Sequence, residues 1–419
     1  MQQIDLEFLL IQITFCLIAI QVCVFIFDKL NAPKVFGEIF AGIVLGPSCF
    51  GFFYPSWFQK IFVSNVVSVF AFKGLQELGL LLLMFCSGLE IQLLIKGRDR
   101  VTCVFSGLLG VVIPFGFALV FYNYINPTKI AGVNGADEGL KYFFAIACSI
   151  TSIPVISRIF MDLQLMQTSF ANLCISIAII EDLVLYAFMA IFIPSKNSSK
   201  FMASVTEGHE ILNHMISTIS LVFIAYKIAP HILMRAKKIK LIQTIFKNYL
   251  TLSFIILTLF TVFSVWLGVP SFLGAFLAGI ILGRTPFQKS EYFEHIKEFS
   301  FSTLIPIFFF GIGIKLDLIK SFNLAFFLIF LFLSSFIKVS GVTVASYFFK
   351  NSFKNSLNFG IALNARGGPG IVLASLGLSL GLINESFFVS LILTALITSW
   401  FAGHWLSTHR AEIKSYTSG

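Results

Sequence analysis

Four charged side chains lie inside long apolar stretches of this sequence, where a charge is expensive. Glu181 and Asp182 are adjacent in one stretch, Lys338 interrupts a second and Arg366 a third. At the centre of a bilayer a charged side chain costs at least ~2.5–3.5 kcal/mol, so such residues are candidates for function and need partners. Two acids and two bases nearly neutralise one another, so a purely structural cluster of buried ion pairs is the alternative.

The two acids are expected to have different roles. Adjacent residues of a helix point about 100° apart, so Glu181 and Asp182 do not face one small site in the same way. Two negative charges this close repel each other, which raises the proton affinity of at least one carboxylate. That carboxylate can then exchange a proton. When that carboxylate is ionised it offers hard oxygen ligands to a cation such as sodium. Binding a proton and a metal ion by turns is the chemistry that this pair predicts.

The two bases differ in what they can do. Lysine loses its proton when it is desolvated, whereas arginine in practice does not, so Lys338 is able to take part in a proton cycle. Arg366 follows a predicted half-helix, whose carboxyl end favours a cation. A role for Arg366 as the partner of that dipole and of a carboxylate, and a direct role in transport, both remain open.

The composition places these residues in a membrane. Of the 419 residues 57% are hydrophobic and only 12% are charged, and apolar runs long enough to cross a bilayer recur along the whole chain. We predict an all-α integral membrane protein with about thirteen spans. They lie near 7–27, 33–50, 66–86, 101–124, 142–160, 170–193, 212–232, 248–266, 269–284, 299–315, 325–348, 356–380 and 386–404.

The net charge of +9 is mainly a topology signal, because the basic residues gather in the loops of one side. The positive-inside rule then puts the N-terminus outside and the C-terminus in the cytoplasm, and we expect no nucleic acid partner. The seven cysteines form no CxxC pair. We therefore expect neither a cofactor nor a resident metal; the only metal is a transported Na⁺ or K⁺ at Asp182.

Two halves of the chain repeat each other. GEIFAGIVLGPS (37–48) matches GAFLAGIILGRT (274–285), the stretch from Phe144 matches that from Phe359, and Gly88 matches Gly313. The matches occur in the same order in both halves and are shifted by seven spans. An odd shift means that each span of the second half crosses the membrane in the opposite direction to its match in the first half. Inverted repeats of this kind are typical of secondary transporters. The domains predicted from this are a first repeat at 1–193, a connecting span and basic loop at 194–247, a second repeat at 248–404 and a short cytoplasmic tail at 405–419.

The repeat also aligns two predicted helix breaks. Pro154 aligns with Pro369, which lies in the run Gly367-Gly368-Pro369-Gly370. Proline withholds a donor from the carbonyl four residues earlier and glycine weakens a helix, so we expect an unwound segment around Pro369. Near Pro154, the hydroxyls of Thr151 and Ser152 can satisfy freed backbone groups. A simple proline kink is the alternative there.

The motifs resemble those of the monovalent cation:proton antiporters, in the branch of the bacterial sodium/proton and potassium/proton exchangers. The stretches that carry the resemblance are PKVFGEIFAGIVLGPS, LQELGLLLLMFCSGLE, TSIPVISRI, IIEDLVLY, LGAFLAGIILGR, LIPIFFFGIGIKLDL, IKVSG and NARGGPGIVLA. The resemblance implies a homodimer with one bundle as scaffold and a second, holding crossed broken helices, that moves like an elevator. It makes Asp182 the residue that binds ion or proton in turn, and Lys338 the partner of the preceding acid. It places Thr151 and Ser152 in the unwound segment beside the site.

One position departs from the family pattern. The residue before the key aspartate is commonly aspartate in electrogenic members and asparagine in electroneutral ones, but here it is Glu181. We predict an electrogenic antiporter that exchanges Na⁺ or K⁺ for H⁺, that is not an enzyme, and that lies in a bacterial inner membrane. The main alternative is a sodium-coupled organic anion symporter of related architecture, in which Arg366 binds the substrate carboxylate. A passive cation channel is the third possibility.

Overall fold

The protein is helical throughout the part of the chain that the computed structural model describes. Those residues are 3–29, 34–89, 99–135, 137–166, 168–192, 216–217, 220–221, 223–236, 249–267, 269, 271–285, 291–348 and 352–416. Among them seven helical segments are long and apolar enough to cross a membrane, and a further pair, Phe353–Leu363 and Gly367–Ser379, is bent by 43° at a short break. The predicted helical membrane fold is therefore confirmed, while the count of thirteen spans stays a prediction.

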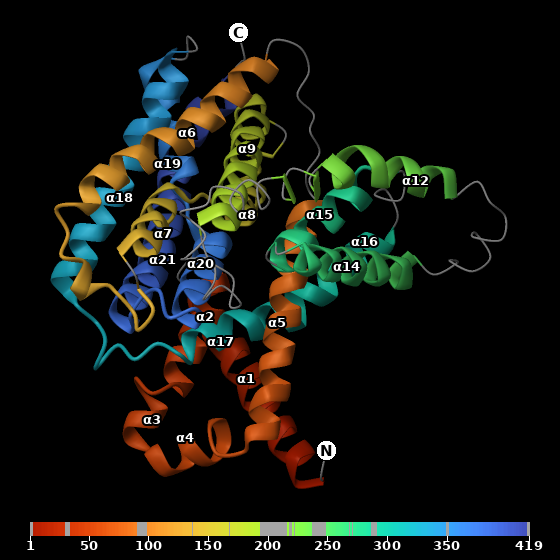
Figure 1. The fold of residues 1–419 in the computed structure, drawn as a ribbon, viewed down its shortest axis with the longest axis vertical. Coiled ribbons are helices and arrows are strands. Elements are labelled where there is room, and N and C mark those ends of the chain that lie inside the picture. The colour runs from red at the N-terminus through yellow and green to blue at the C-terminus, as the bar shows by residue number, and fades with distance from the viewer. Residues whose placement is uncertain are drawn as a thin grey trace. The chain divides into compact units, whose positions relative to one another are not determined.

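The chain packs as two compact units, each built from two separate parts of the sequence (Figure 1). The first unit takes Met1–Gln92 and Ser217–Ser321, and the second takes Leu93–Ile216 and Phe322–Gly419. Each predicted repeat is thus divided between the two units, so a repeat is not a folding unit of its own. A division of this kind follows when helices of one repeat pack against helices of the other.

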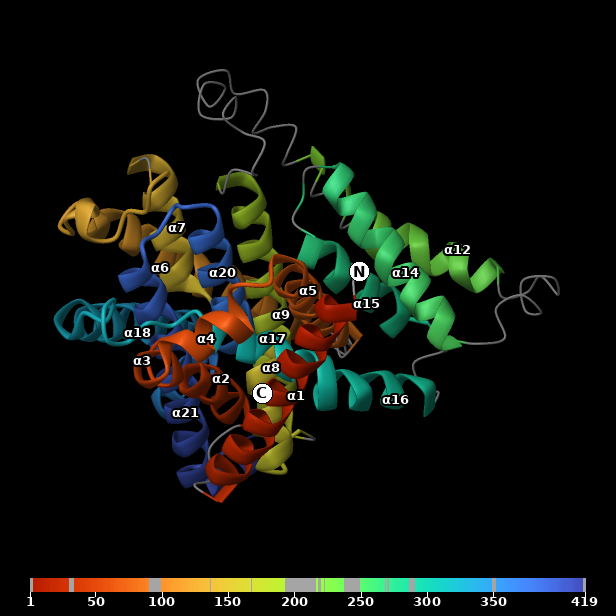
Figure 2. The same cartoon turned by 90° about the horizontal axis from the view of Figure 1, so that it is seen from below.

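The first unit holds the following helical elements. They are α1 (Gln3–Lys29), α2 (Lys34–Leu45), α3 (Phe50–Phe53), α4 (Pro55–Phe62), α5 (Val66–Leu89), η3 (Ile224–Ile228), α12 (Ala229–Ala236), α14 (Tyr249–Trp266), α15 (Ser271–Gly283), α16 (Glu291–Phe299), η5 (Ser300–Leu304) and α17 (Ile305–Gly313). Helix α14 packs against α15 and α16 (Figure 2). The span predicted at 212–232 lies largely outside the described residues.

Glycines set the closest helix crossings of the first unit. A Cβ added at Gly42 of α2 would lie 2.8 Å from the Cα of Gly313 in α17, and one added at Gly279 of α15 would lie 2.9 Å from the Cα of Gly88 in α5. The sequence repeat pairs Gly42 with Gly279 and Gly88 with Gly313, so it converts one crossing into the other. This equivalence supports the inverted repeat.

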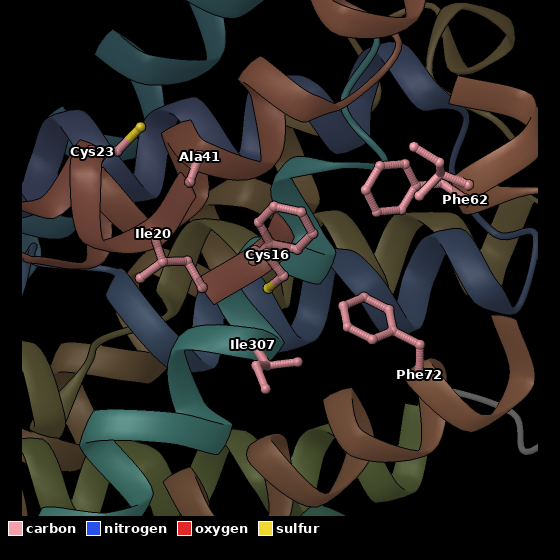
Figure 3. Packing of buried hydrophobic residues seen from close by; sticks show 9 residues of the cluster. Cys16, Ile20, Cys23, Ala41, Phe62, Phe72 and Ile307 are labelled. Atoms are coloured by element: carbon pink, nitrogen blue, oxygen red, sulfur yellow. The ribbon is translucent and has the colours of Figure 1, made fainter. Parts of the chain in front are cut away.

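An apolar cluster fills the space beside the α2–α17 crossing (Figure 3). Cys16 and Ile20 of α1 meet Phe62 of α4 and Phe72 of α5. The ring of Phe310 lies 6.3 Å from that of Phe72 in an edge-to-face arrangement, a geometry that aromatic pairs favour. The short helix α4, which we did not predict, thereby anchors the segment that follows α2.

Span ten starts earlier than predicted. Its helical path begins with α16 at Glu291 and runs through the π-helical turn η5 into α17, whereas the sequence indicated a loop before 299. The charged residues of α16 occupy one face, while Phe293 and Ile296 are buried on the other. The charged residues of this amphipathic helix led us to predict a loop there.

The second unit holds the charged residues. Its helices are α6 (Asp99–Tyr122), α7 (Asp137–Ser149), α8 (Ile153–Asp162), α9 (Ser169–Phe192), α18 (Leu324–Phe348), α19 (Phe353–Leu363), α20 (Gly367–Ser379), α21 (Glu385–Thr408) and α22 (Arg410–Lys414), with a 3₁₀ turn at Pro127–Lys129. Helices α6 and α18 pack on each other (Figure 1). Helix α21 runs past the predicted boundary at 404, and Ile413 of α22 is fully buried.

Two loops of the second unit tie α7 to α20. Ala131, before α7, forms an isolated antiparallel bridge with Ile383, after α20. The amide of Asn134 donates to the carbonyl of Gly381 at 2.8 Å, and Gly381 has a φ of +70°, which favours glycine. The start of one broken helix is therefore fixed to the end of the other.

Candidate functional site

The acidic pair lies on an unbroken helix of the second unit. Helix α9 runs from Ser169 to Phe192 without interruption. Glu181 is fully buried and Asp182 is 2% exposed. Because adjacent helical residues point about 100° apart, the two carboxylates have different neighbours.

Glu181 is held from two sides through one oxygen. Its Oε2 lies 3.0 Å from the Nζ of Lys338 and accepts a hydrogen bond of 2.6 Å from the hydroxyl of Thr151. Its other oxygen, Oε1, is buried without a hydrogen-bond partner in the described part of the chain, against Gly110 of α6, where a Cβ would collide with it. The expected pairing of Glu181 with Lys338 is therefore present.

Lys338 joins four helices. Besides Glu181 of α9, its ammonium donates to the carbonyl of Gly110 in α6 at 3.0 Å and to that of Ser149 in α7 at 2.9 Å, while Lys338 itself belongs to α18. An ammonium has three N–H donors, and here each has an acceptor. A fully buried lysine is thus satisfied in this arrangement.

The first helix break lies at residues 150–152, between α7 and α8. Pro154 is the second residue of α8, so its missing N–H falls in the first turn, where no intrahelical acceptor exists anyway. The Oγ of Ser152 accepts a hydrogen bond from the amide of Val155 at 3.4 Å, as an N-cap residue does. The sequence indicated either a break or a kink here, and the structure has a break that precedes Pro154.

The second break is shorter than predicted. It covers Asn364–Arg366, and α20 already begins at Gly367, so the run Gly367-Gly368-Pro369-Gly370 forms its first turn and is not unwound. The amide of Gly370 donates to the carbonyl of Arg366 at 3.1 Å, closing that turn. A Cβ at Gly367 would lie 2.9 Å from the Oγ of Ser152. This glycine therefore allows the two breaks to approach each other.

Arg366 faces the other broken helix. Its Nη1 donates to the carbonyl of Ala147 at 2.7 Å and its Nη2 to that of Cys148 at 3.0 Å, both at the carboxyl end of α7. Nη2 also donates to the carbonyl of Ser334 in α18 at 2.8 Å. The predicted cation at a helix carboxyl end is present, but the helix is α7 and not α19. The expected carboxylate partner is not found among the described residues.

The crossing is reciprocal, because each break satisfies the end of the opposite half-helix. Arg366 and Lys338 take the last three carbonyls of α7, those of Ala147, Cys148 and Ser149. The hydroxyl of Thr151 lies 2.9 Å from the carbonyl of Leu363, the last residue of α19. The last three carbonyls of α7 and the last carbonyl of α19 are thereby paired with side chains from the opposite break or from α18.

Asp182 is the exception in this network. It is buried, yet its Oδ1 has no hydrogen-bond partner in the described part of the chain, and no ion pair joins it to a described residue. A buried, unpaired carboxylate is strongly unfavourable unless a proton or a cation neutralises it. No cluster of three or more His, Cys, Asp or Glu surrounds it among the described residues. The Oδ1 of Asp182 is therefore open to a proton or a cation.

Sequence reasoning missed the site's backbone ligands. The carbonyls of Gly110, Ser149, Leu363 and Ser334 all accept hydrogen bonds from charged or polar site residues. Every residue has a carbonyl, so residue type gives no signal for it. Gly110 is the only one of the four that its residue type could have indicated, because a glycine in an apolar span leaves room for a neighbouring side chain. Here a Cβ at Gly110 would collide with Glu181.

Two units, one of them with paired helix breaks around buried charges, define the class of secondary active transporters. A family model described as the transmembrane part of sodium/hydrogen exchangers matches residues 13–409. The chain belongs to that family, and its identification as a monovalent cation:proton antiporter is confirmed.

Named relatives and a solved structure agree with the family. The chain is 27% identical over 390 residues to the Na⁺/H⁺ antiporter NhaS4 of Synechocystis, covering 89% of this chain and 90% of the relative. It is 24% identical to the Na⁺/H⁺-K⁺ antiporter GerN of Bacillus cereus, with 88% of each covered. The structure of the sodium proton antiporter MjNhaP1 from Methanocaldococcus jannaschii covers both chains fully with a TM-score of 0.65 at 16% identity, which shows a shared fold.

Proposed function

We propose that this protein exchanges Na⁺ or K⁺ for H⁺, with Asp182 as the carboxylate that binds the cation and the proton by turns. The observation that carries the proposal is the bare Oδ1 of Asp182, buried beside a network in which the neighbouring charges already have partners. A proton and a cation each neutralise that carboxylate, and they exclude one another there. Competition for one carboxylate couples the two fluxes without any covalent step, so the protein is a transporter and not an enzyme.

The experiment is ion exchange in liposomes. Purified protein is reconstituted with a pH-sensitive dye inside, the interior is made acid, and Na⁺, K⁺ or choline salts are added outside. We expect Na⁺ or K⁺, but not choline, to restore the dye signal, and Asp182→Asn to abolish that response while the protein remains folded. Full exchange by folded Asp182→Asn contradicts the proposal.

Glu181 is proposed to stay ionised through its pair with Lys338, which makes exchange electrogenic. The 3.0 Å contact and the Thr151 hydroxyl together hold its Oε2 as a charged acceptor. Exchange rates in liposomes clamped at different membrane potentials test this. Electrogenic exchange responds to the potential, whereas rates independent of the potential contradict this part of the proposal.

The organic anion symporter fits the geometry less well. Three of the five N–H groups of Arg366 already donate to backbone carbonyls, including both of those on Nη2, which leaves the guanidinium fewer donors for a substrate carboxylate. A passive channel would conduct cations without moving protons. Uptake of labelled organic anions driven by sodium, or cation flux without any pH change, would favour one of these over exchange.

We propose a cellular setting and a mode of movement for the protein as well. We place the protein in a bacterial inner membrane as a homodimer, with its N-terminus outside and its C-terminus in the cytoplasm, and we assign alternating access to an elevator movement of the second unit. The excess of basic residues in the loops of one side supports the orientation. Labelling of single cysteines introduced at each terminus from either side of the membrane tests it.

A further inference from the structure

The hydroxyl of Thr394 differs from those of three nearby residues on the same helix. On α21 the hydroxyls of Ser390, Thr398 and Ser399 each donate to the carbonyl four residues earlier, at 2.9, 2.8 and 2.6 Å. Thr394 is 1% exposed, yet its Oγ1 has no partner among the described residues. Other buried hydroxyls of the described chain also have no partner, among them those of Ser334 and Thr343 on α18, so Thr394 is of interest because of the cavity that it lines.

A second unpaired donor shares a cavity with it. The Nε of Arg366 is buried and has no hydrogen-bond partner in the described part of the chain. Arg366 and Thr394 line one cavity of about 10 Å³, whose other walls are Gly370 and apolar side chains. Those side chains are Ala147, Ile150, Phe330, Leu373, Leu391 and Ala395.

We propose that this cavity binds one ordered water molecule and that Thr394 positions Arg366 through it. A cavity of roughly 10–15 Å³ holds a single water when at least two polar groups face it. The water accepts a hydrogen bond from the Nε–H of Arg366 and bonds to the hydroxyl of Thr394. The apolar walls offer nothing further to a larger polar ligand.

The water gives the Nε–H of the guanidinium an acceptor. The terminal nitrogens of Arg366 hold the carbonyls of Ala147 and Cys148, and the next carbonyl, that of Ser149, binds Lys338. Fixing the third nitrogen therefore fixes the end of α7 beside the Glu181–Lys338 pair. Thr394 is a positioning residue in this scheme and does not touch the ion.

An experimental structure with resolved waters tests the site itself. In the unchanged protein we expect density within hydrogen-bond distance, about 2.7–3.2 Å, of both Nε and Oγ1, and in Thr394→Val we expect none. An empty cavity overturns the proposal. A halide ion is the other small polar ligand that could occupy this cavity, and soaking with bromide distinguishes it from water. Anomalous density from bromide in the cavity would assign the site to a halide and overturn the proposal of a water.

The positioning role is tested by exchange kinetics and rests on the proposed function. We expect Thr394→Val to raise the half-saturating cation concentration about two- to tenfold, the effect of one lost hydrogen bond, with little change at saturation. Thr394→Ser should restore it, and Thr398→Val, whose hydroxyl bonds its own helix, is the matched control. Equal kinetics for Thr394→Val and unchanged protein, or equal losses in Thr394→Val and Thr398→Val, overturn the role. If the unchanged protein exchanges nothing, the density experiment still decides the water.

Discussion

The two units bring helices close together in opposite ways. In the first unit, α2 crosses α17 and α5 crosses α15 at glycines, which have no side chain to keep the backbones apart. Gly42 lies against Gly313, and Gly88 lies against Gly279. In the second unit the crossing helices are themselves interrupted, and charges fill the gap. The first solution brings the helix backbones together at glycines and needs no charge at the crossing. The second frees backbone carbonyls and makes room for ionisable groups, which is why we propose the exchange site there.

We predict the largest loss of folding stability when one partner of the buried Glu181–Lys338 ion pair is removed. Lys338→Met leaves Glu181 buried without its cation, which destabilises the fold by about 3–5 kcal/mol. Thermal unfolding in detergent measures this. The double variant Glu181→Gln/Lys338→Met removes both charges and should recover most of the loss. A double variant no more stable than Lys338→Met would mean that the pair does not hold this crossing.

Adding a methyl group at a glycine crossing should be the next largest effect. Gly88→Ala and Gly279→Ala each place a Cβ against backbone of the facing helix, and overpacking of this kind costs about 1–3 kcal/mol. Gly74→Ala is the matched control on α5, because its Cβ meets nothing within 4 Å. Stability equal to that of Gly74→Ala would show that α5 and α15 do not cross here.

We expect loss of the Thr151 hydroxyl to have an intermediate effect on folding stability. Thr151→Val keeps the shape but removes the single O–H donor that Glu181 and the carbonyl of Leu363 share, at about 1–2 kcal/mol. We expect slower exchange and a lower unfolding temperature, with Thr151→Ser close to the unchanged protein. If Thr151→Ser is as impaired as Thr151→Val, then the methyl group and not the hydroxyl carries the effect.

The smallest effect is expected at the cap of α8. Ser152→Ala removes the N-cap acceptor of the Val155 amide and should cost about 1 kcal/mol. Ser152→Thr, which also caps a helix and adds no charge to this buried position, is the comparison. Exchange by Ser152→Ala should be less affected than exchange by Thr151→Val. The reverse order would give Ser152 a role in ion binding instead of helix capping.

The sequence predicted the site's charged residues because burying charge is costly enough to be recognisable in an apolar chain. Glu181, Asp182 and Lys338 were singled out on that ground, and the aligned prolines pointed to the two breaks. The exact position of each break was less readable. Proline disturbs the carbonyl four residues before it, so the unwound residues precede Pro154 and Pro369 and do not surround them.

The partners of Arg366 were not predictable in the same way. Residue type and spacing indicated a cation at a helix carboxyl end, but which helix end it meets depends on how α7 and α20 cross in space. Thr394 gave no signal either, since threonine is common in apolar helices and its spare hydroxyl appears only when its hydrogen bonds are counted. Contacts to backbone need the fold before they can be named.

The central claim, that cation and proton compete for Asp182, is tested most directly by proton release. Na⁺ or K⁺ is added to purified protein in weakly buffered detergent solution, and the pH change is followed. We predict release of protons in proportion to the protein present, none on adding choline, and none from Asp182→Asn. Equal release from unchanged protein and from folded Asp182→Asn would contradict the claim and move the exchange site to another residue.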